Sequence, residues 1–263
     1  MKVPVFMYHE VNSKNIFPEL TKYVNKKYIL KVDSFEAQLE YIRSHNYTVL
    51  TVSELNKPQA ADREGAVVMT FDDGYMGNYL HAFKLLRKFN FKATFFITTD
   101  WVGLPNMLNW KLIKEMNEGG MEIGSHTCSH LLLAGANKKR IEDELRVSKE
   151  ILEEKIKEPV VSISYPNGSF NTLVNTIAYE SGYTRACVSR LGYWKKDSNA
   201  FAIPRITATD NFARFKKIME QDWCFYLKEK TVERAKKMTR TIFGEKIYNK
   251  LYFKLFNLEE IKK

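Results

Sequence analysis

Two adjacent carboxylates carry the strongest chemical signal in the sequence. Asp72 and Asp73 directly follow the apolar run 66–71, and Gly74 comes next. Active sites of parallel α/β proteins lie at the carboxyl ends of strands, which is where this run stops. Neighbouring carboxylates repel each other, so they need a cation or different protonation states. One carboxylate can therefore bind a metal while the other accepts a proton. A solvated Asp-Asp-Gly turn would use the same residues.

Two histidines four residues apart form a second signal. His126 and His130 follow the short apolar segment 121–123, which we expect to be a strand. Neutral imidazole suits zinc and other transition metals. One carboxylate and this pair would hold a divalent metal, zinc in the first place, and leave positions open for water and substrate. Cys128 could be a thiolate ligand, but its place between the histidines favours a side chain that points away.

A third polar segment follows another predicted strand, 160–164. It reads Ser-Tyr-Pro-Asn-Gly-Ser-Phe-Asn over residues 164–171. Pro166 and Gly168 favour a tight loop. Such a loop can present backbone N–H groups to a developing oxyanion, although by itself it indicates only a turn.

The elements that must position these residues alternate between short β-type runs and amphipathic segments. We expect strands over residues 3–8, 47–50, 66–71, 93–98, 121–123, 160–164 and 184–188. We expect helices over residues 34–45, with Ser34 as the cap, and over 79–89, 110–117, 138–157 and 172–180. Repeated β-then-α units predict a mostly parallel sheet with helices outside. About seven units in one domain favour a distorted (β/α) barrel over an open sheet.

Composition is that of a globular protein. The chain has 263 residues, of which 44% are hydrophobic and 27% are charged, enough for one large domain and against global disorder. The net charge is +10, and residues 211–263 hold fourteen basic against seven acidic residues. We expect a catalytic domain over residues 1–210 and a basic C-terminal extension of two or three helices over 211–263. Such an excess fits nucleic acid, anionic lipid or acidic glycan, or simply a soluble surface.

Three cysteines without regular spacing do not suggest a disulfide framework and fit a reducing compartment. The apolar run at the N-terminus is too short for a signal peptide, and no run of about twenty apolar residues could span a membrane. The sequence therefore predicts a cytoplasmic protein. No nucleic-acid-binding motif is visible, so we expect no nucleic acid partner.

These motifs together resemble the polysaccharide deacetylases of carbohydrate esterase family four, the NodB-homology domain. The similarity covers roughly residues 1–210 and rests on Thr-Phe-Asp-Asp-Gly-Tyr at 70–75 and on the pair His126 and His130. The branch that deacetylates poly-N-acetylglucosamine is the most similar, because its chains open with a strand ending in Tyr-His, here Tyr8 and His9. The resemblance implies a barrel of the NodB type and removal of an acetyl group from a sugar.

The resemblance also implies individual roles. They are general base for Asp72, metal ligands for Asp73, His126 and His130, general acid for His9, and oxyanion donor for the backbone N–H of Asn167. An acid from the C-terminal side is excluded, since no histidine follows His130.

Two departures from the family pattern affect the site. Many members carry an arginine in the third motif, where Ser164 or its neighbours stand here, and the late Arg205 could supply the missing cation. Asn167 occupies the place of a second aromatic residue, which removes a sugar-stacking surface. Trp110 and Trp194 are alternatives for stacking, although each could equally be a core residue.

The predicted function is removal of N-acetyl groups from an N-acetylated amino sugar, in a glycan or a lipid-linked sugar, by a metal-dependent hydrolase. O-deacetylation of a glycan is the alternative reaction. A catalytically inactive carbohydrate-binding module would be expected to have lost ligands, whereas the key positions are intact.

The extension could place the protein at a membrane. Segment 242–261 interleaves apolar and aromatic residues with Lys246, Lys250 and Lys254, which recur every four residues along one helical face. Helices of this kind lie on anionic bilayers. A helix packed over the barrel would show the same pattern, so peripheral contact with the inner membrane surface is one of two predictions.

Overall fold

The computed structural model describes residues 2–13, 24, 28–55, 65–235 and 238. The chain divides into two compact units, Met1–Phe215 and Lys216–Lys263. The first unit contains every residue to which the sequence assigns a role in catalysis. The assignment of a separate basic extension beginning at residue 211 stays a prediction, and segment 242–261 lies outside the described residues.

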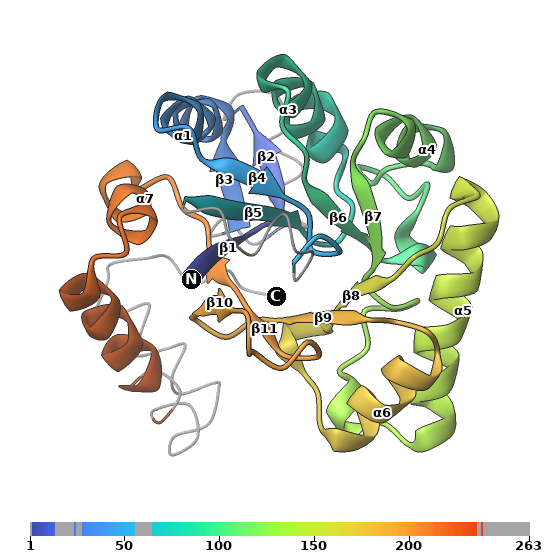
Figure 1. Ribbon diagram of the computed structural model, residues 1–263. Coiled ribbons are helices and arrows are strands. Elements are labelled where there is room, and N and C mark those ends of the chain that lie inside the picture. Colours follow the sequence, from blue (N-terminus) through green and yellow to red (C-terminus); the bar gives the residue numbers. More distant parts are fainter. Residues whose placement is uncertain (1, 14–23, 25–27, 56–64, 236–237, 239–263) are drawn as a thin grey trace, which may run out of the picture. The chain divides into compact units, whose positions relative to one another are not determined.

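The first unit is built on one ten-stranded sheet (Figure 1). Its strands are β1 (Lys2–Tyr8), β4 (Thr48–Leu50), β5 (Ala66–Phe71), β6 (Thr94–Ile97), β7 (Glu122–Ser125), β8 (Ser162–Ser164), β9 (Arg185–Val188), β10 (Tyr193–Lys195), β11 (Ile203–Pro204) and β12 (Ile206–Thr207). They follow the order β10-β1-β5-β6-β7-β8-β9-β11, with β4 paired to β5 and β12 to β1. Every pair in this sheet is parallel except β1 with β10.

A short segment, residues 203–207, joins the two ends of the strand order. β11 pairs with β9, and β12 pairs with the end of β1 through Phe6 and Ile206. Only Arg205 separates β11 from β12, so residues 203–207 link the last strand to the first. The sheet thus returns on itself as a nearly closed barrel, which confirms the predicted fold. A second, two-stranded sheet pairs β2 (Glu10–Asn12) with β3 (Ile29–Lys31).

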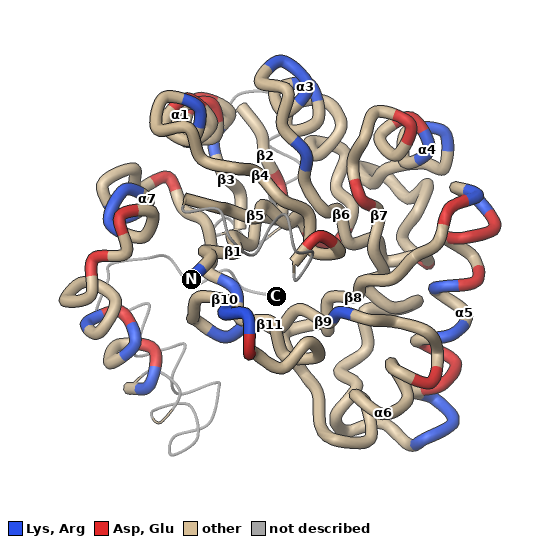
Figure 2. The backbone as a smooth tube through the Cα atoms, viewed as in Figure 1, with Lys and Arg blue, Asp and Glu red and all other residues tan. Residues whose placement is uncertain are grey.

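Helices lie outside the barrel in chain order (Figure 1). They are α1 (Val32–Ser44), the π-type turn η3 (Asn78–Phe83), which runs into α3 (Lys84–Phe89), α4 (Trp110–Glu118), α5 (Lys138–Ile156) and α6 (Thr172–Glu180). Most positions coloured as charged residues lie along the helices, and few lie along the strands (Figure 2). None of the helices among the described residues combines the length and the apolar character needed to cross a membrane.

The predicted elements differ from the observed ones in detail. α1 begins at Val32 with Lys31 as its cap residue, so Ser34 lies inside the first turn and does not cap the helix. The strand expected over 121–123 is β7, which continues to Ser125 and so leads directly into the histidine segment. The sequence did not predict five short strands, each of two or three residues: β2, β3, β10, β11 and β12.

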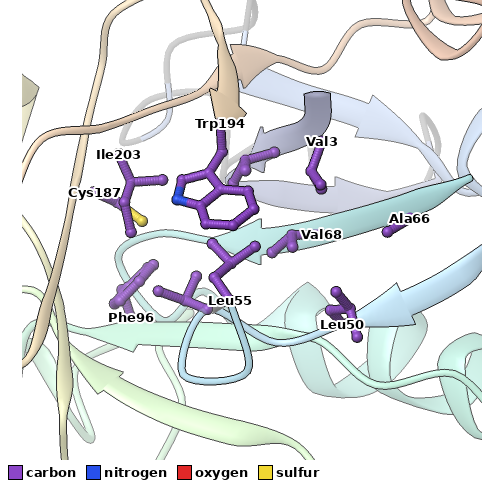
Figure 3. Close-up of a cluster of buried hydrophobic side chains, with 11 residues drawn as sticks. Val3, Leu50, Leu55, Ala66, Val68, Phe96, Cys187, Trp194 and Ile203 are labelled. Carbon is purple, nitrogen blue, oxygen red and sulfur yellow. The ribbon is translucent and has the colours of Figure 1, made fainter. Parts of the chain in front are cut away.

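An apolar cluster fills the barrel around Trp194 (Figure 3). Val3, Val68, Phe96 and Ile203 are among its members, and they come from β1, β5, β6 and β11. Trp194 itself is 1% exposed. It is therefore a core residue and unavailable for stacking on a sugar, whereas Trp110 stays partly exposed at the start of α4.

Candidate metal centre and active site

The end of the buried strand β5 delivers the two carboxylates. All six residues of β5 are buried, and the N–H of Asp72 still bonds the carbonyl of Tyr8 on β1 at 3.0 Å. Asp73 is the first residue to leave this ladder, and its φ of 78° lies in the left-handed region. The change of backbone conformation lets neighbouring side chains face different partners. The two carboxylates accordingly have separate surroundings.

Asp73 faces the two histidines. Its Oδ1 lies 3.3 Å from Nε2 of His126 and 3.6 Å from Nε2 of His130. One candidate ligand atom from each of the three residues lies within 4.8 Å of the others. His126 and the carboxylate are buried, and His130 is partly exposed. The three residues come from the ends of two strands, β5 and β7, which the sheet brings together through β6.

The donor set fits a divalent metal. Oδ1 of Asp73 is buried and accepts no hydrogen bond from any described residue. Nδ1 of His126 lies 2.7 Å from the carbonyl oxygen of Ser164, which can accept only if Nδ1 carries the proton. In the neutral imidazole, Nε2 then keeps its lone pair, which a metal next to Asp73 would accept, as in metal sites where a backbone carbonyl orients a ligating histidine. One carboxylate and two imidazoles suit zinc with open positions.

Cys128 is outside this set. Its thiol is only partly exposed, and Sγ lies near the carbonyls of Asp143 and Glu144 on α5. Burial raises the pKa of this thiol to about 11. The thiol is directed towards α5 and is not one of the three residues whose ligand atoms come together.

Asp72 is held by Arg205 from the run that closes the barrel. The guanidinium forms two hydrogen bonds of 2.7 Å with the carboxylate, and also bonds Thr70 and Ser164. The Ser164 hydroxyl donates a third bond to the carboxylate, at 3.2 Å. Burial alone would raise the pKa of Asp72, but the charge of Arg205, with His126, lowers it well below its ordinary value. Asp72 is therefore ionised throughout the physiological range.

His9 lies at the end of β1, the neighbour of β5. Its ring stacks on Tyr28 with centroids 4.3 Å apart, and its carbonyl accepts a hydrogen bond from Asn78. Burial lowers the pKa of His9 below its ordinary value, and the charges of Asp73 and Asp72 oppose this shift. His9 follows β1 directly, and β1 is paired with β5, the strand that carries the two carboxylates.

Asn167 lies in the turn η6 (Pro166–Gly168), directly after β8. It is exposed, and its φ of 53° and ψ of 16° are left-handed. The turn follows the same strand end as Ser164, whose side chain bonds Asp72. Among the described residues, no hydrogen bond or ion pair joins the side chain of Asn167 or that of His9 to Asp72 or to the Asp-His-His cluster.

Two aromatic residues at the site were not singled out from the sequence. Trp101, in the turn η4 (Thr99–Trp101) after β6, stacks on His130 with centroids 5.1 Å apart. Tyr75 lies two residues beyond Asp73; burial and that carboxylate raise the pKa of its phenol. The sequence could have pointed to both residues, because each lies within four residues of the end of a predicted buried strand.

Fold and site together define an α/β-barrel protein with a candidate hydrolytic centre at the carboxyl ends of its parallel strands. The sequence model of the family described as "Polysaccharide deacetylase" matches residues 59–186. YxkH of Bacillus subtilis, which bears the same family description, is 31% identical over 208 residues, 78% of this chain and 71% of YxkH. The chain therefore belongs to the polysaccharide deacetylases, and we describe it as a carbohydrate deacetylase, a hydrolase.

Two named deacetylases and one further solved structure resemble this chain. The poly-β-1,6-N-acetyl-D-glucosamine N-deacetylase of Staphylococcus aureus is 27% identical over 225 residues, 78% of each chain. The structure of the Streptococcus pyogenes deacetylase PplD in complex with acetate aligns with a TM-score of 0.72 and 25% identity, over 80% of this chain and 94% of PplD. IcaB from Ammonifex degensii, at 21% identity and a TM-score of 0.71 over 83% and 96%, shares the fold.

Proposed function

We propose that this protein removes N-acetyl groups from an amino sugar, in a glycan or a lipid-linked sugar, with a divalent metal, zinc, held by Asp73, His126 and His130. The observation that carries the proposal is the separation of two adjacent carboxylates. Asp73 faces two imidazoles with an oxygen that accepts no hydrogen bond from the described residues. Asp72 forms an ion pair with the guanidinium of Arg205. The S. aureus relative is named for this reaction on poly-N-acetylglucosamine.

Each residue has a definite task in this proposal. Asp73, His126 and His130 would hold the metal, which would supply Lewis-acid chemistry to the acetyl carbonyl and to a water molecule. Asp72 accepts the proton of the attacking water, and Arg205 keeps that carboxylate ionised and oriented. The backbone N–H of Asn167 donates to the negative charge that develops on the acetyl oxygen. His9 protonates the departing amine, which is otherwise a very poor leaving group. Acetate and a free amino sugar result.

O-deacetylation is the second candidate reaction on the same site. An alkoxide leaves more readily than the anion of an amine, so an ester depends less on protonation by an acid at His9. His9 follows β1, the neighbour of the strand that carries both carboxylates, and an acid at this place supports the amide reaction. Cytoplasmic location and contact with an anionic membrane rest on the sequence alone and stay predictions.

Acetate release tests the proposal. Metal-free protein receives Zn²⁺ or buffer and is offered β-linked N-acetylglucosamine oligomers, a lipid-linked N-acetyl amino sugar, and an O-acetylated glycan. We expect zinc-dependent acetate release from an N-acetylated substrate. Full activity in saturating chelator would contradict the metal site. Acetate release from the O-acetylated glycan alone would show that the enzyme is an O-deacetylase and not an N-deacetylase. Asp73→Ala is the matched control, expected to lose both metal and activity.

A further inference from the structure

A buried carboxylate outside the catalytic set lies beneath the segment that joins the two histidines. Glu144 is in the middle of α5 and is 1% exposed. It is not part of the Asp-His-His cluster. A buried charge is costly unless hydrogen bonds and opposite charges compensate it. Its partners therefore show what the carboxylate is for.

Both oxygens of Glu144 are used, and most of their partners belong to the histidine segment. Oε2 accepts the backbone N–H of Cys128 at 2.8 Å and that of Ser129 at 2.9 Å. Oε1 accepts the Ser129 hydroxyl at 2.5 Å and pairs with Arg140 at 2.7 Å. The two residues whose N–H groups are bound are the second and third after His126, and His130 follows them directly.

The segment needs such support because its backbone is unfavourable. Thr127 and His130 have φ angles of 67° and 61°, in a region that costs non-glycine residues free energy and persists only where the surroundings enforce it. Two further bonds act locally, from the Thr127 N–H to Ser125 and from the His130 N–H to the Thr127 hydroxyl. Glu144 holds the stretch between the two left-handed residues to a helix that is itself packed on the barrel.

We propose that Glu144 is a positioning residue of the metal centre. By binding the N–H groups of Cys128 and Ser129, it fixes His130 relative to His126 and so sets the affinity for the metal. The inference rests on the proposed metal site but adds a residue that touches neither metal nor substrate. Outer partners of metal ligands generally change metal affinity about 10- to 100-fold when they are removed.

Two conservative variants separate this role from a simple effect of negative charge. In Glu144→Gln, the amide oxygen can replace Oε2 and still accept both N–H groups, while the charge is lost. In Glu144→Asp, the charge stays, but the side chain is one methylene shorter and no longer reaches the segment. A positioning role therefore predicts that Gln preserves the metal affinity and that Asp weakens it. A long-range attraction of the cation by the carboxylate predicts the reverse order.

The experiment measures the Zn²⁺ dissociation constant of the full chain by competition with a chromophoric chelator. The absorption spectrum of bound Co²⁺ reports the ligand geometry. We expect the dissociation constant of Glu144→Asp to rise about tenfold or more, with an altered Co²⁺ spectrum. That of Glu144→Gln should stay within about threefold of the parent, with the parent spectrum.

Leu152→Ala is the control for stability. Leu152 is on the same helix and fully buried, but it makes no bond to the histidine segment. It should lower the melting temperature through a cavity and leave the zinc affinity unchanged. A loss of affinity in Leu152→Ala equal to that of Glu144→Asp would overturn the proposal, as would unchanged affinity in Glu144→Asp or the reversed order of the two Glu144 variants. A parent that binds no zinc would instead overturn the metal site itself.

Discussion

Asp72 and Asp73 are chemically identical neighbours, yet the structure gives them different environments. Asp72 bonds a guanidinium and a hydroxyl, whereas Asp73 turns to two imidazoles through a left-handed backbone. Adjacent carboxylates can remain ionised together when each has its own positive partner. Arg205 is that partner for Asp72, and the proposed metal would be the partner for Asp73. The geometry thus supports the proposal that Asp72 transfers the proton and that Asp73 binds the metal.

Asp72→Asn tests this division at the residue scale. The amide cannot accept a proton, so turnover should fall about 100- to 10,000-fold while zinc stays bound. Arg205 loses its partner as well, so the variant should also unfold at a lower temperature, and metal content must be measured on folded protein. Loss of zinc in Asp72→Asn with retention in Asp73→Asn would reverse the two assignments.

His9→Ala tests whether His9 is the general acid. An amide substrate should slow about 100- to 10,000-fold, because the amine must be protonated as it leaves. An activated aryl acetate has a good leaving group and should slow far less. Both rates are measured on the same zinc-loaded preparation, so that the metal content cancels. An equal loss on the two substrates would remove His9 from the mechanism.

At the scale of elements, the run 203–207 has two tasks. β11 and β12 close the barrel between β9 and β1, and Arg205 between them bonds the carboxylate of Asp72. The closing run is thus joined to β9 and β1 by backbone hydrogen bonds, and to the residue that follows β5 by an ion pair. Barrel closure and the orientation of Asp72 are coupled through one buried residue.

Arg205→Met should remove the link between barrel closure and the orientation of Asp72. Removing one partner of a buried ion pair leaves an uncompensated charge and costs about 3–5 kcal/mol. The free energy of unfolding in urea should fall by this amount. The double variant Arg205→Met with Asp72→Asn removes both charges and should recover a substantial part of the loss. A double variant as unstable as the sum of the two single variants would argue that the pair is not coupled.

Glu10 gives the folded molecule a pH dependence. Its carboxyl group is 2% exposed, and burial raises its pKa from 4.5 to about 8, although the Gly77 N–H and the Asn12 side chain lower it. The folded chain thus keeps a proton that the unfolded chain releases. The free energy of unfolding should therefore fall as the pH rises from about 4.5 to about 8 and level off above that range.

Glu10→Gln should abolish this contribution, because the amide stays neutral. Its melting temperature should match that of the parent near pH 5 and exceed it increasingly towards pH 8. Glu118→Gln, on the exposed side of α4, is the matched control and should show no such trend. A difference between Glu10→Gln and the parent that stays constant from pH 5 to pH 9 would contradict the buried proton.

Membrane contact is a prediction for the whole chain that rests on segment 242–261. If this segment lies on an anionic bilayer, the intact protein should float with anionic vesicles and less so as salt rises. A chain ending after residue 240 should not float. Absence of binding by the intact protein would leave the packed helix as the remaining interpretation.

Much of the site could be predicted from the sequence because its signals are local. The Asp-Asp pair follows a six-residue apolar strand, and the two histidines follow a shorter strand. The end of a predicted strand therefore indicated the place of each motif. Alternating β and α segments likewise predicted the barrel. Long helices such as α5 were found within one or two residues, since their apolar stripe extends over several turns.

Partnerships between distant residues were decided only by the tertiary structure. The resemblance offered Arg205 as a cation, but no spacing in the chain shows that it bonds Asp72, 133 positions away. Trp194 is in the core because β10 pairs with β1, and the three residues of β10 leave no periodicity from which that pairing could be read. Glu144 lies on the buried stripe of α5, between Ile141 and Ser148, yet its use depends on a loop that another strand delivers. Local patterns record burial and strand ends, whereas hydrogen bonds across the barrel depend on which strands the closed sheet makes neighbours.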